Sequence, residues 1–198
     1  MAYPDRVRFL YIARHGETDF NKEGRLQGHT DRPLNDTGRA QALAMAERMR
    51  PFGLARVGAS TLSRAAETAS ICAGALGVPA DYADSDFRER AYGAFEGLTR
   101  DELLARHAEE YRAWQENNRF TPPGAESYQE LVDRMLRATV RAADEAQKES
   151  GNLLVVSHGG AMRALVFGAT GKTLPPLANG TVFRVVFDGA QIVSFDEP

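Results

Sequence analysis

Short apolar runs that fit strands alternate with stretches of helical periodicity along the chain. The expected strands are residues 8–13, 56–60, 153–157, 181–187 and 191–195. Apolar residues at helical spacing predict helices over about 38–49, 63–76, 101–116, 127–151 and 160–167. The unbroken apolar character of 153–157 is typical of a strand covered on both faces. This order predicts an α/β fold, a three-layer αβα sandwich whose mostly parallel central sheet has helices on both faces.

Local signals sharpen several boundaries. Ser63 is expected to cap the second helix, and Ser127 with Glu130 forms a capping-box pattern at the start of the long one. Asp188-Gly189 between the last two strands is a strong hairpin signal. Since 198 residues suit one domain, we expect a single domain over 1–198 with a helical insert at about 98–123.

The composition is that of an ordinary soluble globular protein. The net charge is −3 and no basic block occurs, which argues against nucleic acid as a partner. No apolar stretch approaches ~18 residues, so no membrane span is expected. Residues 1–8 lack the apolar core of a signal peptide, and the single cysteine, Cys72, excludes an internal disulfide and lies in a predicted helix core. A cytoplasmic protein fits these features, and they predict no oligomeric state.

Chemically active residues follow three of the expected strands. The first strand ends in Arg14-His15-Gly16, the second is followed by Arg64, and the 153–157 strand ends in Ser157-His158-Gly159-Gly160. The carboxyl ends of neighbouring parallel strands meet at one edge of a sheet, where ligands bind. Two arginines, two imidazoles and a helix N-terminus at that edge suit a phosphate group.

A metal site is the alternative use of paired histidines. The chain has no two-histidine helix pair at i, i+4 and no cysteine cluster, and arginines beside the histidines would repel a cation. We therefore expect no metal. Only three of the 24 basic residues are lysines, so an arginine is informative only in a special structural position.

Arg14-His15-Gly16-Glu17-Thr18 resembles the RHG signature of the histidine phosphatase superfamily, which includes cofactor-dependent phosphoglycerate mutases and many small phosphatases. The resemblance covers nearly the whole chain. It continues at residues 21, 25–28, 31–34, 38–42, 63–69, 88–93, 96–97 and 157–160. Residues 123–127 are similar to the family's Gly-Glu-Ser element, but with an extra alanine, Ala125.

The resemblance implies a role for each group. His15 would be the nucleophile that becomes a phosphohistidine, without a metal or organic cofactor. Arg14, Arg64 and His158 would surround the phosphoryl oxygens, and Glu89 would protonate the leaving alkoxide. Glu17 is expected to support the loop. The expected substrate-binding residues are Asn21, Gln27, Gly28, Arg90, Tyr92, Arg100, Gly159 and Gly160.

The insert at 98–123 is expected to roof the pocket. Its aromatic residues, Tyr111, Trp114 and Phe120, either face the substrate or pack inside the insert. His29 either lines the pocket or lies at the surface, and His107 is expected on an exposed helix.

These features favour a phosphomonoester hydrolase that acts on small phosphorylated metabolites. A phosphoglycerate mutase is the first alternative, but the interval from Gly97 to Ser157 is short and Gly160 stands where those mutases usually carry asparagine. A non-catalytic module that binds a phosphorylated ligand is the second alternative. It predicts that a catalytic group is missing, and none is.

Overall fold

The computed structural model describes residues 9–117, 119–148, 151–188 and 191–198, and these contain a six-stranded sheet in the order β3-β2-β4-β1-β5-β6. The strands are β1 (Leu10–Arg14), β2 (Leu54–Ala59), β3 (Tyr82–Ala83), β4 (Asn152–Ser157), β5 (Val182–Asp188) and β6 (Gln191–Asp196). The β1, β2, β3 and β4 strands are parallel, whereas β5 is antiparallel to both β1 and β6. The predicted mostly parallel α/β sheet is confirmed.

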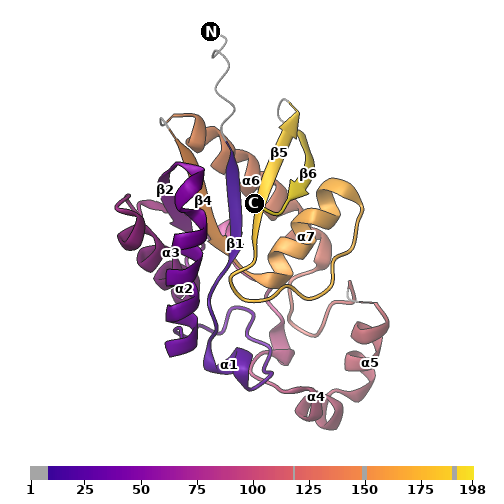
Figure 1. Ribbon diagram of the computed structural model, residues 1–198. Coiled ribbons are helices and arrows are strands. Elements are labelled where there is room, and N and C mark those ends of the chain that lie inside the picture. Colours follow the sequence, from indigo (N-terminus) through magenta and orange to yellow (C-terminus); the bar gives the residue numbers. More distant parts are fainter. Residues whose placement is uncertain (1–8, 118, 149–150, 189–190) are drawn as a thin grey trace.

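Helices cover both faces of the sheet (Figure 1). On one face lie α2 (Asp36–Met49) and α3 (Ser63–Leu76), and on the other lie α6 (Tyr128–Gln147) and α7 (Gly159–Thr170). Successive strand residues point to opposite faces, so Tyr11 packs with α2 and α3 while Leu10 and Ile12 pack with α6 and α7. Residues 153–157 of β4 are all buried, as the continuous apolar run predicted.

The local signals had mixed outcomes. The capping box of α6 is confirmed, because Ser127 N donates to Glu130 Oε2 at 2.9 Å and Glu130 N donates to Ser127 Oγ at 3.2 Å. The prediction that Ser63 caps α3 is wrong: Leu62 is the N-cap, and the Ser63 hydroxyl donates to Asp31 instead. Arg8, residues 149–150 and the Gly189 half of the hairpin signal lie outside the described residues.

The helix expected over 101–116 is two helices, α4 (Arg100–Arg106) and α5 (Ala108–Glu116). The break is at His107, whose backbone leaves the helical region at φ −140° and ψ 44°. Its half-buried ring lies 5.7 Å from the Phe95 ring rather than free on an exposed helix. Phe95, Leu103 and Tyr111 form a small separate core here, so Tyr111 packs inside the insert.

Both short helices of the insert lie at the carboxyl end of β1, at the bottom of Figure 1, near α1 (Asp19–Lys22). Three 3₁₀ turns complete the fold: η1 (Arg50–Phe52), η2 (Ser85–Phe87) and η3 (Gly93–Phe95). Cys72 is buried in α3 as predicted, and burial raises the pKa of its thiol to about 12. Within the described ranges, no helix combines the length and the apolar character needed to cross a membrane.

Candidate active site

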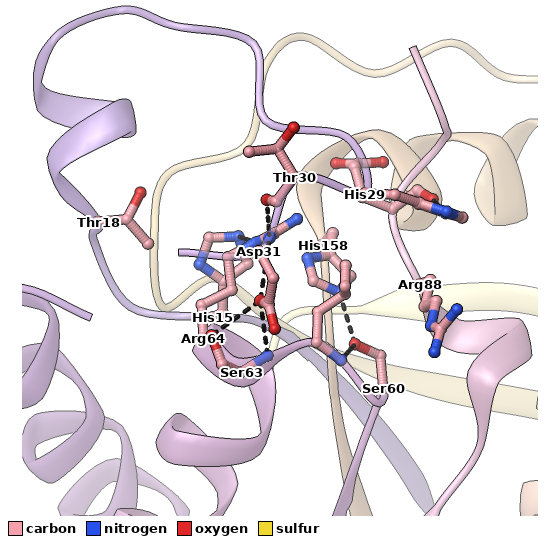
Figure 2. A network of polar contacts seen from close by, with 12 residues as sticks. His15, Thr18, His29, Thr30, Asp31, Ser60, Ser63, Arg64, Arg88 and His158 are labelled. Carbon is pink, nitrogen blue, oxygen red and sulfur yellow. Dashed lines mark hydrogen bonds and ion pairs between the residues drawn. The ribbon is translucent and has the colours of Figure 1, made fainter. Parts of the chain in front are cut away.

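His15 and His158 follow two strands that are hydrogen-bonded neighbours. In the parallel pairing of β1 with β4, Arg14 lies opposite Ser157, so the next residue of each strand enters the same space. The two imidazole rings are 5.0 Å apart between centroids. Figure 2 shows them with Arg64, which reaches the same space from α3. The structure therefore brings together the groups that the strand ends suggested.

The hydrogen bonds of His15 fix its tautomer. Its Nδ1 lies 2.6 Å from the carbonyl oxygen of Gly16, which can only accept, so Nδ1 carries the proton. Its Nε2 accepts a hydrogen bond from Arg64 Nε at 3.2 Å. Burial, followed by the charges of Arg64 and Arg14, holds the pKa of His15 well below its usual range. The ring is therefore neutral near pH 7, with a lone pair on Nε2.

Ser60 orients the second imidazole. Its hydroxyl lies 2.6 Å from His158 Nε2 and accepts from the backbone N–H of Leu62, so the hydroxyl proton is available for Nε2 (Figure 2). The protonated nitrogen of His158 is then Nδ1, which is buried and has no partner among the described residues. Burial, then the charge of Arg64, also holds the pKa of His158 well below its usual range.

Arg64 is the largest fully buried side chain among the described residues. Its Nη2 donates to Gly28 O at 2.8 Å and its Nη1 donates to Thr30 O at 3.2 Å, while the Asp31 carboxylate lies 4.0 Å away. Asp31 in turn accepts from the N–H and the hydroxyl of Ser63 (Figure 2). Burial lowers the pKa of Arg64, and nearby carboxylates oppose that shift.

Arg14 reaches the same space from the end of β1. Its Nη1 donates to Leu177 O, and its Nε is buried with no partner among the described residues. Burial lowers its pKa, and the charge of Glu89 is the largest opposing influence, so these two side chains lie near each other. Arg14 Nε and His158 Nδ1 are thus two buried donors that an anion's oxygen atoms would satisfy.

Glu89 faces the start of α7. Its Oε2 accepts from Gly160 N at 2.8 Å, and its Oε1 accepts from Arg90 N at 2.8 Å. A Cβ atom at Gly160 would lie 2.5 Å from Glu89 Oε1 and 2.8 Å from the Tyr92 hydroxyl. Gly160 is therefore required for a close approach, and the position predicted as substrate-binding makes room for the carboxylate and the phenol.

The other predicted substrate-binding residues divide by their contacts. Gln27 is 7% exposed, and its Oε1 has no partner among the described residues. Gly28 is left-handed at φ 55°, and a Cβ there would collide with the Glu96 carboxylate. A Cβ at Gly159 would lie 3.3 Å from Arg14 Nε. Asn21 caps the loop after His15, since its Oδ1 accepts from Thr18 N at 3.2 Å.

Arg90 lines a small cavity near Glu89 and Arg100 lies at the surface, so the substrate contacts expected of both residues stay a prediction. Arg90 is 2% exposed, and its guanidinium donates to the carbonyl oxygens of Glu126 and Phe120. The bond to Phe120 O fixes the backbone of Phe120, the third aromatic residue of the insert. Arg100 is exposed at the first position of α4.

A small cavity lies beside Glu89, lined by Tyr92, Trp114, Tyr128, Arg163 and Gly160 among others. Trp114 both packs on Phe95, with ring centroids 6.1 Å apart, and lines this cavity. His29 is an exposed residue whose Nε2 lies 2.8 Å from the carbonyl oxygen of Glu89.

Sequence reasoning missed four supporting residues: Ser60, Asp31, Asn179 and Glu96. Asn179 donates to His15 O at 3.0 Å, and the Glu96 carboxylate accepts from the N–H groups of His29, Thr30 and Tyr92. Glu17, by contrast, supports the loop as expected, by accepting from Asn35 Nδ2 at 2.9 Å. Ser60, Asp31 and Glu96 lie in segments already singled out from the sequence, but only the fold reveals their partners. Asn179 had no signal at all.

Residues 10–194 match the family model described as histidine phosphatase superfamily (branch 1). The chain is 33% identical over 188 residues to a 2,3-bisphosphoglycerate-dependent phosphoglycerate mutase of Methylobacterium sp., covering 91% of this chain and 90% of that protein. It is 35% identical over 170 residues to a metal-independent phosphoserine phosphatase of Arabidopsis thaliana, covering 83% and 69%. The structure of a mycobacterial glucosyl-3-phosphoglycerate phosphatase complexed with VO3 matches with a TM-score of 0.85 at 27% identity, covering 96% and 98%.

Proposed function

The chain belongs to the histidine phosphatase superfamily, and on that premise we propose that it hydrolyses small phosphomonoesters through a phosphohistidine on His15. One observation carries the proposal: the Nε2 lone pair of a neutral His15 faces Arg64 at 3.2 Å, with the His158 ring 5.0 Å away. A neutral imidazole is nucleophilic at the nitrogen that carries no proton. The surrounding donors suit the three oxygens of a phosphoryl group.

In the first step His15 Nε2 attacks phosphorus and the bond from phosphorus to the ester oxygen breaks. The proton stays on Nδ1 and is donated in a hydrogen bond to Gly16 O, which stabilises the positive charge that develops on the ring. Arg14, Arg64 and His158 hold the oxygen atoms of the transferring group, where the transition-state charge is spread. Glu89, in its protonated form, gives its proton to the leaving alkoxide.

In the second step water attacks the phosphohistidine. Glu89, now a carboxylate, accepts a proton from this water, the bond from phosphorus to Nε2 breaks, and phosphate leaves with His15 neutral again. No metal or organic cofactor takes part in either step. Arg14 and Arg64 supply the positive charge that a metal would otherwise provide, and the neutral His158 adds a hydrogen-bond donor.

A phosphoglycerate mutase is the second candidate, and the Methylobacterium relative favours it. Its match covers 90% of that mutase, so chain length does not separate the two activities. Gly160 still favours hydrolysis, because the space that a side chain would occupy there belongs to Glu89 and Tyr92. The named substrates of the relatives, phosphoserine and glucosyl-3-phosphoglycerate, are the first compounds to test.

The test measures phosphate release from a panel of phosphorylated metabolites by the purified protein and by His15→Ala. We expect turnover by the wild type, none by the variant, and an acid-labile phosphoprotein after rapid quenching of the wild type. Interconversion of phosphoglycerates with a bisphosphoglycerate primer, without phosphate release, would establish the mutase instead. Tight phosphate binding without any turnover would leave only a binding module.

A further inference from the structure

Glu89 lies on a segment that has almost no regular structure of its own. After η2 (Ser85–Phe87), residues 88–92 form neither helix nor strand. A group that delivers a proton in the transition state must be held within a fraction of an ångström of its position. A loop alone does not supply such rigidity. Contacts with other parts of the fold must therefore fix the position of this segment.

The guanidinium of Arg134 makes most of the hydrogen bonds that fix the segment around Glu89. Its Nη1 donates to Asp86 O at 2.7 Å and to Arg88 O at 2.7 Å, and its Nη2 donates to Glu89 O at 2.8 Å. Arg134 lies in α6, the helix whose apolar side is buried against the sheet. The backbone on both sides of the Glu89 side chain is thus tied to a rigid helix.

Glu126 fixes the orientation of this guanidinium. Its Oε1 accepts from Arg134 Nε at 2.5 Å and its Oε2 accepts from Arg134 Nη2 at 2.8 Å, with side-chain exposures of 15% and 11% for the acid and the arginine. The five N–H donors of an arginine are therefore all used in this arrangement. Lysine has three donors on one nitrogen and cannot reproduce the planar fork.

Other contacts hold the segment from different directions. His29 Nε2 lies 2.8 Å from Glu89 O, so this carbonyl oxygen lies between an imidazole and a guanidinium. Ser157 Oγ donates to Phe87 O at 2.8 Å and ties the segment to the end of β4. Glu126 N also donates to Ala91 O at 3.0 Å. None of these bonds involves the Glu89 carboxylate, which is left to Gly160 N and Arg90 N.

We propose that Arg134, oriented by Glu126, is the positioning residue that holds Glu89 in place to protonate the leaving group. The inference rests on the proposed function, since it assigns to Arg134 an effect on the proton-transfer step. Arg134 touches no substrate. Its removal weakens proton delivery and leaves the attack by His15 and the phosphoryl-holding groups intact.

The dependence of the rate on the leaving group separates this role from a general loss of stability. p-Nitrophenyl phosphate releases an ion that needs no proton, whereas glycerol 1-phosphate releases an alkoxide that does. We compare kcat/KM, which reports the phosphorylation step, for the two substrates in the same enzyme preparation. The ratio of the two values does not depend on the fraction of folded enzyme.

In Glu89→Gln the ratio of the glycerol 1-phosphate value to the p-nitrophenyl phosphate value should fall by roughly 10²–10⁴-fold. In Arg134→Lys it should fall in the same direction by about 10²-fold, the cost of a misplacement near 1 Å. Glu126→Gln retains the size of the acid and should lower the ratio less. It also serves as the second variant if Arg134→Lys does not fold.

Arg141→Gln is the matched control. Arg141 lies two turns further along α6 and contacts the same segment, but through the side chains of Asp84 and Asp86, both at 2.8 Å, and it is 47% exposed. This variant should leave the ratio unchanged. If the ratio falls in Glu89→Gln but stays at the wild-type value in Arg134→Lys and Glu126→Gln, the positioning role is wrong and the proposed function stands. If it does not fall in Glu89→Gln, the role proposed for Glu89 itself fails.

Discussion

Replacing Gly160 by alanine adds one methyl group at the point where α7 meets Glu89. The added Cβ would lie 2.5 Å from Glu89 Oε1, whereas ordinary contact begins at 3.4 Å, so the carboxylate must move by about 0.9 Å. The Tyr92 hydroxyl, 2.8 Å from the same Cβ, blocks one direction of escape. If Glu89 is the proton donor, as proposed, a shift of this size costs roughly 10²-fold in rate. We therefore expect Gly160→Ala to lose about that factor in kcat/KM on glycerol 1-phosphate.

The free energy of unfolding should change much less than the rate. Gly160 is the second residue of α7, and alanine in a helix is favoured over glycine by about 0.5–1 kcal/mol. Helix propensity therefore offsets part of the clash. The assay pairs kinetics on glycerol 1-phosphate with a thermal melt. Activity should fall sharply while the Tm stays within a few degrees of the wild-type value.

Gly159→Ala is the comparison variant. Its Cβ would approach Arg14 Nε at 3.3 Å, which requires an adjustment of only a few tenths of an ångström. Gly159→Ala should lower kcat/KM on glycerol 1-phosphate several-fold at most. Wild-type turnover of glycerol 1-phosphate by Gly160→Ala would refute the reasoning, and so would a rate loss that is matched by a large fall in Tm.

Three further outcomes can be measured. Ser60→Ala leaves His158 Nε2 buried without its 2.6 Å partner, at a cost of about 1–3 kcal/mol. Phosphate, measured by calorimetry, should therefore bind at least several-fold more weakly. Unchanged binding would contradict the tautomer assigned to His158. Burial and the charge of Arg64 lower the pKa values of His15 and His158 in the native protein. Below about pH 6.5 the unfolded chain therefore binds more protons than the native one, and the free energy of unfolding falls as the pH falls. Ring NMR signals of the native protein that titrate at about pH 6.5 would refute this. Arg163 lines the cavity beside Glu89, where its guanidinium can pair with the carboxylate of phosphoserine. Since a charge-assisted hydrogen bond is worth roughly 1.5–3 kcal/mol, Arg163→Gln should raise KM at least about tenfold for phosphoserine but not for glycerol 1-phosphate. Equal effects on both substrates would show that Arg163 does not pair with this carboxylate.

The sheet and the two histidines could be predicted because they depend on local signals and one general rule. The apolar runs defined β1 and β4, and parallel neighbours place their carboxyl ends together, which is how His15 and His158 come to lie 5.0 Å apart. Ser63 was assigned wrongly for an equally local reason. A serine at a helix start usually caps it, but here the Asp31 carboxylate, 32 residues away, takes both its N–H and its hydroxyl.

The supporting residues could not be predicted, since their partners are distant in the sequence and their types are common. Arg134 is one arginine among many in a helix, and nothing in its local sequence indicates that it donates to three carbonyl oxygens 45–48 residues away. Arg90 is a second example. Its local sequence does not indicate that its guanidinium donates to the carbonyl oxygens of Glu126 and Phe120, although the residue also lines the cavity beside Glu89.

The electrostatics of the site follow from how Arg64 is buried. A guanidinium without solvent is costly unless its donors are satisfied and its charge is balanced. Two carbonyl oxygens and His15 Nε2 accept from three of its donors. The Asp31 carboxylate, however, lies 4.0 Å away, and Arg14 adds a second positive charge to the same space. Burial first, and this positive charge second, hold the pKa values of both imidazoles low, so both rings stay neutral. The proposed attack by His15 requires a neutral ring. The same excess charge favours a dianionic phosphoryl group over water in that space. Under the proposed function the arginines would both hold the phosphoryl group and help to keep the nucleophile neutral, so neutralising Arg64 should raise the pKa of His15 as well as weaken phosphate binding.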